Sequence, residues 1–504
     1  MTVPSNSQVG RPAQAPGLAL SELVPGASGT IGGITLDSRH VLPGDLYVGL
    51  PGERTHGGRF AASAADAGAV AVLTDGAGRG LAGDLEIPVV VVDDPRAAMA
   101  PIAARIYGEP TARALTLGVT GTNGKTSTVF LVEAALTALG RVPATVGTIG
   151  FRVGGEPLDV DRSTVTTPES PDLQALLAVM GERGADAFAM EVSSHALALH
   201  RVDGITFDVA AFTMLGQDHL DFHHTMENYF AAKASLFLGG RSRAAVVNID
   251  DPWGRRLAGL VRDDGHARLV TTAVEREADY RIVASETHAD GSADVRLATP
   301  NGEVAFGLTM LGDFNARNAL TALAMVGAAG LDVRAAAAGL RGAQVPGRMQ
   351  RVDLPDGSPN VVVDFGHTPQ AVEAALSALP RTGRVIAVLG AGGDRDATKR
   401  GPMGAAAARQ ADVVVVTDDN PRSEDPATIR AAVLQGAREQ ADAGTEVVDG
   451  GDRRGAIARA LRLTGPGDWV AVLGKGHERG QDVAGVISPF DDVAVVRELV
   501  RGGE

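Results

Sequence analysis

The last third of the chain repeats one pattern of hydrophobic and polar positions. The runs are "NVVVDFG", "RVIAVLGAGG", "DVVVVTDDN" and "DWVAVLGKG", and in each a Val-rich segment leads directly into Gly, Asp or Asn. Helix-forming stretches such as "PQAVEAALSAL" separate them. This alternation predicts a doubly wound parallel sheet, whose ligand loops gather at the carboxyl ends of the strands.

A related alternation runs through the first two thirds of the chain. Near the N-terminus, "AVAVLT", "PVVVVDD" and the helical "RFAASAADAGA" predict a small α/β domain. Further on, "LTLGVT", "AFAMEV", "VDGITFDVAAFTML" and "AAVVNI" predict a mostly parallel sheet with crossover helices. Residues 266–311 alternate more like antiparallel strands, which suggests an appended meander, and "NARNALTALAMVGAAG" is predicted to be helical.

Pro and Gly interrupt the pattern at "IYGEPTARA" and near "AQVPGRMQRV", which predicts two domain boundaries. A length of 504 residues also exceeds what one hydrophobic core usually supports. We therefore predict an α/β protein with a small α/β domain, a central domain with a phosphate-loop type of parallel sheet and appended antiparallel strands, and a C-terminal Rossmann-like domain. The expected bounds are 1–17 for a disordered leader, then 18–110, 111–345 and 346–504.

Composition narrows the classes of function. The formal net charge of −15 argues against general binding to nucleic acids or anionic membranes. The sequence has no apolar run long enough for a membrane span, and its N-terminus lacks the pattern of a secretion signal. Cysteine is absent, so any metal must use oxygen or His ligands, and a cytoplasmic location is expected.

The segment "GVTGTNGKTST", residues 118–128, lies between a strand pattern and a helix pattern. Its spacing is G-x-x-G-x-x-G-K-T, because Val119 stands where the strict phosphate loop has Gly. Glycines let backbone N–H groups close on phosphate oxygens, and the helix predicted over 126–139 adds its positive end. Lys125 can reach the β- and γ-phosphates and the Thr126 hydroxyl can bind Mg²⁺, so we predict a nucleoside triphosphate site rather than an ordinary Gly-rich turn.

Two further stretches gather groups that could bind metal. "MEVSSHALALHRV" places Glu191 at a strand end, and "GQDHLDFHHTMENYFAAKASLF" holds Asp218, His219 and His223, with Lys233 further on. A single His is more often a surface or packing residue. Here three His lie within six residues beside carboxylates, which predicts a metal site with oxygen and nitrogen ligands.

With these motifs in view, the chain resembles the Mur ligases. The phosphate loop, the two stretches above, "GDFNARNALTALA", "VPGRMQRV" and "VDFGHTPQAVEAAL" occur in the order seen in that family, over about residues 36–492. Mur ligases are cytoplasmic, ATP-dependent amide-bond-forming enzymes that build the stem peptide of peptidoglycan. The sequence departs from the family pattern at Met214, where relatives commonly have Asn.

The resemblance implies a substrate site. "LDSRHVLPGDLYVGLPGERTHGGRF" is similar to the uridine diphosphate domain of the family member that adds the third residue of the stem peptide, and "STVTTPES" is similar to its muramoyl-dipeptide loop. The residues implied for this substrate, UDP-N-acetylmuramoyl-L-alanyl-D-glutamate, are Ser38, Thr166, Thr167, Ser194, His200 and Arg201.

The resemblance also implies a catalytic and metal centre. The implied catalytic residues are Lys125, Lys233, His219 and Glu191, and the implied ligands of two Mg²⁺ ions are Thr126, Glu191, His219 and Lys233. Lys233 would serve as a CO₂-derived carbamate, because adding CO₂ to a neutral amine replaces a cation that repels Mg²⁺ by a carboxylate. The alternative is an unmodified, solvated helix lysine.

For ATP, the resemblance implies residues of both the second and the third domain, with domain closure assembling the site. These residues are Gly121, Thr122, Asn123, Gly124, Lys125, Thr126, Ser127, Asn248, Asn315, Asn318, Arg348, Asp364 and His367. The two Asn at 315 and 318 have an alternative role, which is to cap or bend the start of a helix.

The third domain carries the choice of amino acid. "TDDNPRSEDP" contains Asp419, Asn420, Pro421 and Arg422, and it resembles the D-N-P-R signature of ligases that add meso-2,6-diaminopimelate. Diaminopimelate has a distal carboxylate that lysine lacks, and a guanidinium offers that carboxylate a planar fork. Arg395, Gly474 and Glu478 are implied as further contacts to the amino acid. The alternative for D-N-P-R is a Pro turn with a surface Arg.

The sequence thus predicts an ATP-dependent ligase that acts through an acyl phosphate and releases ADP and phosphate. Its expected partners are the three small-molecule substrates, with no nucleic acid, and the expected state is a monomer. Three alternatives stay open: a lysine-adding Mur ligase, a ligase similar to folylpolyglutamate synthase, and a nucleotide-gated switch without ligation. A nucleic-acid motor fits least, because no basic stretch interleaved with aromatic residues occurs.

Overall fold

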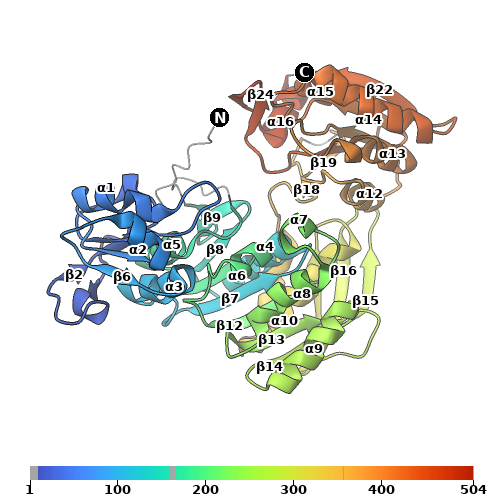
Figure 1. Cartoon of the computed structure of the whole chain (residues 1–504). Coiled ribbons are helices and arrows are strands. Elements are labelled where there is room, and N and C mark those ends of the chain that lie inside the picture. The colour runs from blue at the N-terminus through green and yellow to red at the C-terminus, as the bar shows by residue number, and fades with distance from the viewer. Residues whose placement is uncertain (1–9, 159, 161–164, 356, 503–504) are drawn as a thin grey trace. The chain divides into compact units, whose positions relative to one another are not determined.

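The computed structural model describes residues 10–158, 160, 165–355 and 357–502. By its internal contacts the chain forms two compact units. One consists of Met1–Val283, Leu297–Val304 and Asn318–Gly339, and the other of Ala284–Arg296, Ala305–Arg317 and Leu340–Glu504. The boundary therefore passes through β15 (Tyr280–Thr287), β16 (Ala293–Thr299), β17 (Gly302–Leu308) and α10 (Asp313–Ala328), whose positions in the chain can be followed by colour in Figure 1.

The N-terminal part of the first unit is a small parallel sheet with helices on both faces. Its strand order is β3-β4-β5-β6, and every pair is parallel. The elements are β3 (Gly33–Thr35), β4 (Asp45–Gly49), α1 (Ala61–Asp66), β5 (Ala71–Thr74), α2 (Gly76–Ala82), β6 (Val89–Val91) and α3 (Pro95–Ile106). Alternate residues of β4 and β5 enter two separate apolar clusters, which accounts for the Val- and Ala-rich runs in the sequence.

The central sheet of the chain has the order β10-β9-β8-β11-β7-β12-β13-β14-β15-β16-β17. Its parallel part runs from β8 to β15. The strands are β7 (Leu115–Thr120), β8 (Pro143–Gly147), β9 (Gly150–Val153), β10 (Glu156–Pro157), β11 (Ala187–Glu191), β12 (Phe207–Phe212), β13 (Ser242–Asn248), β14 (Arg268–Ala273), β15 (Tyr280–Thr287), β16 (Ala293–Thr299) and β17 (Gly302–Leu308).

Crossover helices connect the parallel strands, as the sequence predicted. They are α4 (Lys125–Ala138), α5 (Ser170–Glu182), α6 (Ser194–Ala198), α7 (Leu220–His223), α8 (Met226–Ala234) and α9 (Pro252–Asp264), followed by α10 (Asp313–Ala328) and α11 (Val333–Ala337). On β11, Phe188 and Met190 join the same buried cluster as Leu173 and Leu176 of α5. Strand alternation therefore seats α5 against one face of the sheet.

The expected antiparallel meander over 266–311 is shorter than predicted. Strand β14 lies parallel to β13, and β15 lies parallel to β14, so the parallel sheet extends to residue 287. Within 266–311, the strands that follow one another as neighbours through the shortest connections are β15, β16 and β17. Residues 268–273 alternate in burial because β14 is covered on one side, and such a half-covered strand has the same period as an antiparallel one.

The C-terminal part of the second unit is a doubly wound sheet of order β18-β19-β23-β20-β21-β22, as predicted. Its strands are β18 (Gln350–Arg351), β19 (Asn360–Asp364), β20 (Val385–Leu389), β21 (Val413–Thr417), β22 (Glu446–Gly451) and β23 (Trp469–Leu473), and a hairpin adds β24 (Gly480–Val483) and β25 (Val486–Pro489). Its helices are α12 (Pro369–Ser377), α13 (Arg400–Gln410), α14 (Pro426–Gln440), α15 (Arg453–Leu463) and α16 (Asp492–Arg501).

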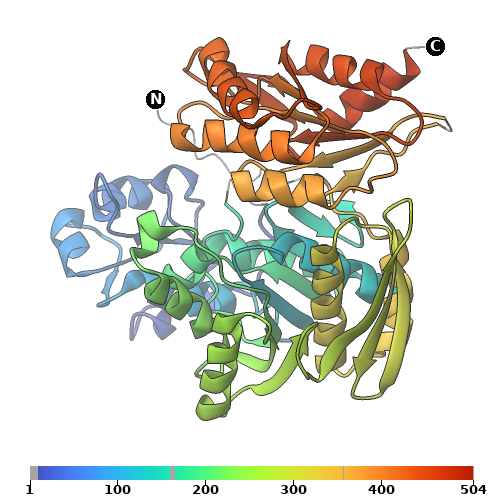
Figure 2. The same cartoon turned by 90° about the vertical axis from the view of Figure 1, so that its right-hand side faces the viewer.

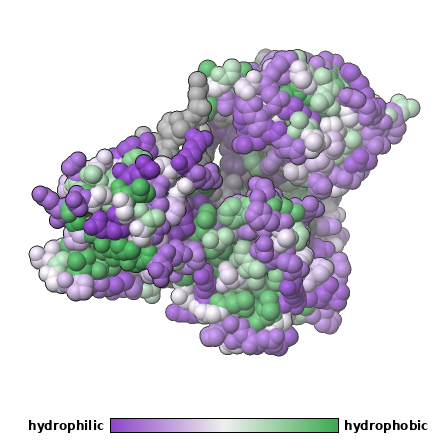
Figure 3. All heavy atoms as spheres, viewed as in Figure 1, coloured by the Kyte–Doolittle hydropathy of each residue, from purple (hydrophilic) through white to green (hydrophobic). Residues whose placement is uncertain are grey.

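Helices cover both faces of this sheet (Figures 1 and 2). Val414 and Val416 of β21 pack into the cluster that contains α12, α13 and α14, whereas Val413 and Val415 pack into the cluster that contains α15 and α16. A strand buried on both faces reads as an unbroken Val run, and that is the pattern seen in the sequence. The face of this unit drawn in Figure 3 is mostly hydrophilic.

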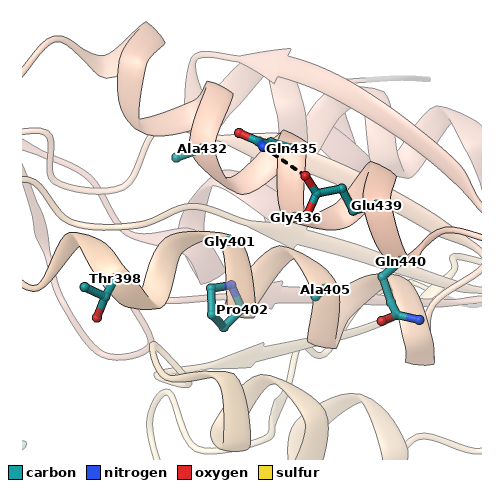
Figure 4. A pocket seen from close by; sticks show the side chains of 9 residues that line it. All are labelled: Thr398, Gly401, Pro402, Ala405, Ala432, Gln435, Gly436, Glu439 and Gln440. Carbon is teal, nitrogen blue, oxygen red and sulfur yellow. Dashed lines mark hydrogen bonds between the residues drawn. The ribbon is translucent and has the colours of Figure 1, made fainter.

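A shallow groove marks the crossing of α13 and α14 (Figure 4). Glycine at position 436 allows the two helices to approach closely, since a Cβ there would lie 2.0 Å from the backbone oxygen of Gly401. The lining residues are Thr398, Gly401, Pro402, Ala405, Ala432, Gln435, Gly436, Glu439 and Gln440. None of them belongs to the predicted site. The close packing of the two helices accounts for the groove.

The expected disordered leader over 1–17 falls into two parts. Residues 1–9 lie outside the described residues. In the remainder, Arg11 donates to Asp45 at 2.5 Å, and the backbone N–H groups of Ala13 and Gln14 donate to Glu182 at 3.0 and 2.8 Å. Residues 11–14 thus have fixed partners, which the lack of periodicity in this stretch did not indicate.

Candidate active site

The predicted phosphate loop joins β7 to α4 at the carboxyl edge of the central sheet. Gly124 caps the helix with a φ of +87°, a conformation that other L-residues rarely adopt. The Lys125 ammonium donates to the backbone oxygens of Gly121 and Thr122 at 2.8 and 2.9 Å. The loop, its lysine and the positive end of a 14-residue helix therefore meet at one point, which suits a bound triphosphate.

The segment after β12 supports this loop. The Thr213 hydroxyl donates to the Asn123 oxygen at 2.6 Å, and the Thr122 N–H donates to the Met214 oxygen at 2.8 Å. The Asn248 side chain donates to the Thr213 oxygen at 2.8 Å. Met214, where the sequence departs from the family pattern, thus contacts the loop through its backbone, and its sulfur lies 4.0 Å from the Asn123 amide nitrogen.

Replacing Gly124 by Ala is expected to weaken ATP binding about tenfold or more, because the new Cβ would lie 2.5 Å from the Asn318 side-chain oxygen. The matched control is Gly140→Ala at the other end of α4, where φ is +74° and nothing lies within 4 Å of the new Cβ. Both changes should cost about 1–2 kcal/mol of stability for the left-handed backbone. Urea unfolding and nucleotide titration separate the two effects, and equal ATP affinity in both variants would contradict the prediction.

Lys233 of α8 reaches the same loop from the other side. Its side chain is 1% exposed, and its ammonium nitrogen donates to the Gly121 oxygen at 2.9 Å and lies 4.6 Å from the centre of the Tyr229 ring. Burial, reinforced by the charge of Lys125, lowers the pKa of Lys233 well below its usual value. A buried amine whose charged form is disfavoured thus lies beside the phosphate loop, so the alternative of a solvated helix lysine does not hold.

The implied magnesium ligands lie around this loop. Glu191 ends β11 beside Val119 of β7, and its carboxylate accepts from the N–H and hydroxyl of Thr148 at 2.8 and 3.1 Å. Thr126 is buried at the start of α4. His219 has Lys125 and Lys233 as charged neighbours, and burial lowers its pKa.

Among the described residues no group of three His, Asp or Glu forms a complete protein cage. Hydroxyl and carboxylate donors in such a sparse set fit Mg²⁺, which takes many of its ligands from substrate phosphates and water.

A cluster of aromatic rings includes one of the metal candidates, His219. His195 packs against His219 and Phe222, with ring centres 4.8 and 4.3 Å apart. The His223 Nε2 lies 2.9 Å from the Ser194 hydroxyl, and burial, with the charge of His195 as the second cause, lowers the pKa of His223 to about 4. A neutral His223 therefore orients Ser194, whereas the sequence had grouped it with possible metal ligands.

Several residues implied for the muramoyl substrate meet at the end of β11. The Thr167 hydroxyl donates to the Glu191 oxygen at 2.9 Å, and the hydroxyls of Thr166 and Thr148 lie 3.1 Å apart. Arg201 donates to the Thr167 oxygen at 3.1 Å. It is also paired with Glu169 at 2.8 Å. Glu169 in turn binds Arg96 of α3 at 2.7 Å, and neither of these partners had been singled out from the sequence.

Three predicted residues lie apart from this group or have other partners. His200 bonds Asp203 at 2.6 Å, and Ser38 begins a single 3₁₀ turn in the N-terminal sheet domain. The Asn315 side chain donates to the Leu311 oxygen at 2.9 Å at the start of α10. That bond matches the alternative reading of Asn315 as a residue that fixes a helix start.

In the second unit, Asp364, Arg348 and His367 lie together around the C-terminal end of β19. The Asp364 carboxylate accepts from the N–H groups of Met349 and Gly366, both at 2.7 Å, and burial raises its pKa. The Arg348 guanidinium lies 4.5 Å from the centre of the Phe365 ring, and the Phe365 oxygen lies 3.0 Å from the His367 Nδ1. The three implied ATP residues of the third domain thus share one loop system.

The D-N-P-R stretch lies at the carboxyl ends of β20, β21 and β23. Arg422 donates to the Gly393 oxygen at 2.7 Å, and a Cβ on Gly392 would lie 3.0 Å from the Arg422 Nη1 and 3.8 Å from the Arg395 side chain. Both predicted arginines therefore border Gly392. The backbone of Arg422, with a φ of +52°, is held by the hairpin β24–β25, since its N–H donates to the Asp482 oxygen at 3.0 Å. Arg422 is half-exposed, so the alternative of a Pro turn with a surface Arg stays open, but its guanidinium and its backbone both have fixed partners.

Behind this stretch lies a buried lysine that sequence reasoning missed. Lys475 is 0% exposed and donates to the Asn420 and Glu478 side chains, both at 3.1 Å. Its ammonium is also 3.7 Å from Asp419. The signal in the sequence was a lysine directly after a buried Val-rich strand, between two glycines, in "VLGKGHE".

Comparison with known proteins accounts for the order of these motifs. Three protein-family models match the chain. Residues 30–107 match "Mur ligase family, catalytic domain", residues 119–326 match "Mur ligase middle domain", and residues 347–476 match "Mur ligase, glutamate ligase domain". A protein of Streptomyces coelicolor named UDP-N-acetylmuramoyl-L-alanyl-D-glutamate–2,6-diaminopimelate ligase is 50% identical over 489 residues, which cover 96% of this chain and 95% of that protein.

Solved structures agree with these matches. A structure of a UDP-N-acetylmuramoyl-L-alanyl-D-glutamate–2,6-diaminopimelate ligase superposes with a TM-score of 0.71 at 30% identity, covering 97% of this chain and 99% of that chain. A Mycobacterium tuberculosis folylpolyglutamate synthase superposes with a TM-score of 0.59 at 21% identity over 75% of this chain and 92% of that chain, a likeness of fold alone. The predicted three-domain α/β architecture is therefore confirmed.

Proposed function

Because the chain belongs to the Mur ligase family, we propose that it joins meso-2,6-diaminopimelate to UDP-N-acetylmuramoyl-L-alanyl-D-glutamate at the expense of ATP. The product is the UDP-muramoyl tripeptide of peptidoglycan synthesis, with ADP and phosphate. The observation that carries the proposal is the meeting of Lys125 and the buried Lys233 on one carbonyl of the phosphate loop. A simple nucleotide switch has no need for a second, buried lysine at that point.

In the first step, the side-chain carboxylate of the D-glutamyl residue attacks the γ-phosphorus of ATP. The bond between that phosphorus and the β–γ bridging oxygen breaks, ADP leaves, and an acyl phosphate forms. Lys125 and the N–H groups of residues 121–127 stabilise the charge on the transferred group. Thr166, Thr167, Ser194 and Arg201 would hold the carboxylate substrate next to the loop.

Thr126, Glu191, His219 and a carbamylated Lys233 would hold two magnesium ions. When bound, Mg²⁺ supplies positive charge that screens the triphosphate from the attacking carboxylate. The lowered pKa of Lys233 favours the modification, since only a neutral amine adds CO₂. The modified side chain exchanges a potential cation for a carboxylate at the centre of the site.

In the second step, the amine of diaminopimelate attacks the acyl carbon. The tetrahedral intermediate expels phosphate, and the amine loses a proton as the amide forms. Arg422 and Arg395 would bind the distal carboxylate, while the Gly474 carbonyl and Glu478 would accept from the distal ammonium. Lysine lacks that carboxylate and would leave two arginines without a partner, so it is discriminated against.

The biological setting follows from this reaction. The enzyme would act in the cytoplasm as a monomer and supply a precursor for cell-wall growth, cell shape and division. No helix among the described residues is long and apolar enough to cross a bilayer. Its three partners are small molecules.

A phosphate-release assay with the muramoyl dipeptide nucleotide, varying only the amino acid, tests the proposal. We expect ADP and phosphate, not AMP and pyrophosphate, and a kcat/KM for meso-diaminopimelate about 10³-fold or more above that for L-lysine. Efficient use of lysine with diaminopimelate inert would assign the chain to the lysine-adding branch. No turnover with any amino acid would leave a nucleotide-binding protein without ligation.

A further inference from the structure

Lysine is scarce in this chain, and its few positions are informative. The sequence has four lysines among 46 basic residues, at 125, 233, 399 and 475. Arginine therefore supplies nearly all the surface cations. Lys125 and Lys233 lie at the phosphate loop, and Lys399 has Asp419, Arg395 and Arg422 as charged neighbours. The fourth lysine is the buried one behind the D-N-P-R stretch.

Lys475 lies in a tight turn between two glycines. The flanking Gly474 and Gly476 have φ values of +111° and +55°, which turn the chain sharply on both sides of the lysine. A Cβ on Gly476 would lie 2.7 Å from the Gly347 oxygen and 2.8 Å from the Phe365 backbone, so this turn has no spare room. An ammonium is a small point donor, whereas a guanidinium is a wide planar fork.

The bonds of Lys475 fix the orientation of two predicted ligand residues. The Asn420 Oδ1 accepts from Lys475 at 3.1 Å and from the Asp482 N–H at 3.0 Å, so its amide nitrogen must face Glu478, to which it donates at 2.8 Å. The Glu478 Oε2 thus accepts from both Asn420 and Lys475. Among the described residues both bonds end on Oε2, which leaves Oε1 to accept from a ligand.

Two carboxylates lie close to the Lys475 ammonium, and one of their oxygens has no hydrogen-bond partner among the described residues. The carboxylates are those of Asp419 and Glu478, and the oxygen is the buried Oδ1 of Asp419. A buried carboxylate oxygen without a hydrogen-bond partner, beside a half-exposed second carboxylate, favours an incoming cationic donor. The distal ammonium of a diamino acid has that charge.

We propose that Lys475 is a positioning residue, which holds Glu478 and Asn420 in the orientation that receives the ammonium of the incoming amino acid. The proposal rests on the proposed function, since it needs an amino acid to bind at Arg422 and Glu478. Lys475 itself does not touch the substrate. It neutralises part of the carboxylate charge and turns one oxygen of Glu478 towards the ligand.

The test uses the full chain and four variants: Lys475→Met, Glu478→Gln, the double variant, and Arg454→Met. Lys475→Met keeps the length of the side chain and removes its charge. Arg454 is a half-exposed arginine of α15 paired with Glu498, and it serves as the control for loss of a cation in the same domain. The readouts are KM for meso-diaminopimelate, for ATP and for the muramoyl nucleotide, together with kcat and the unfolding temperature.

We expect Lys475→Met to raise KM for meso-diaminopimelate about 10- to 100-fold, since hydrogen bonds between charged groups are lost, with both other KM values changed less than about twofold. The double variant should match Glu478→Gln alone, because Lys475 acts through Glu478. A lower unfolding temperature with unchanged KM, an equal rise in all three KM values, or effects that multiply in the double variant would each overturn the proposal. A wild-type protein that is inactive with meso-diaminopimelate would overturn the proposed function as well. The wild-type assay therefore distinguishes failure of the proposed function from failure of the role proposed for Lys475.

Discussion

Replacing Lys233 by Ala is expected to lower the rate of ligation by about a thousandfold, the size of effect seen when one group that stabilises transition-state charge is removed. The change removes the buried amine that contacts the Gly121 oxygen, and with it the site of the proposed carbamate. The measurement is phosphate release at saturating substrates. Short carboxylic acids such as acetate or propionate should restore part of the activity, because they can occupy the space that the carbamate would fill.

A matched variant separates this effect from a loss of structure. Arg256→Ala on the neighbouring α9 removes an exposed cation that pairs with Glu227 of α8, the helix of Lys233, and it should leave the rate within about twofold. Unaltered activity of Lys233→Ala would remove this residue from the site. If Lys233→Ala loses both its activity and its cooperative unfolding transition, and no acid restores the activity, Lys233 has a packing role only.

Arg422→Lys and Arg422→Met are expected to raise KM for meso-diaminopimelate by about 10²- to 10³-fold, equivalent to about 3–4 kcal/mol for the loss of a carboxylate partner. Arg422→Lys keeps the charge but loses the planar fork, so it should recover little of the affinity. The KM for ATP should stay constant, since Arg422 lies in the D-N-P-R stretch and not at the phosphate loop. The measured quantity is kcat/KM for meso-diaminopimelate and for L-lysine in each variant.

The ratio of the two kcat/KM values is the sharper readout. Removing the guanidinium should bring the two amino acids closer together, because the arginine that lysine leaves unpaired is gone. Arg454→Lys, at a half-exposed arginine of the same domain that pairs with Glu498, is the control and should keep the wild-type ratio. A ratio that does not move in Arg422→Met would mean that another group chooses the amino acid.

Much of this fold could be read from the sequence, because its strands are buried on both faces. Val413 to Val416 form an unbroken apolar run, since alternate residues enter clusters on opposite sides of the sheet. The phosphate loop was equally readable, because Gly121 and Gly124 take backbone conformations that other residues avoid. Where backbone conformation or burial dictates the residue type, the sequence pattern predicts the local structure well.

Other features depend on partners far away in the sequence, and no local pattern indicates them. Asp482 and Ala484 bind the backbone of Arg422 across some 60 residues of chain, and Glu169 links Arg201 to Arg96 of another domain. The meander was predicted too long because a half-covered parallel strand, β14, has the same period as an antiparallel one. Long-range pairing and register arise from tertiary packing, which outweighs local preference.

The placement of the lysines has a practical consequence for chemical labelling. Reagents that acylate primary amines would find no decoy side chains, because the abundant surface cations are guanidinium groups. Of the four ammonium groups, those of Lys125 and Lys399 are partly exposed, whereas those of Lys233 and Lys475 are enclosed. Dyes or resins that couple through side-chain amines would therefore react first at Lys125 in the phosphate loop and at Lys399 near Arg395 and Arg422, and protection of these two positions by a substrate would test the proposed sites.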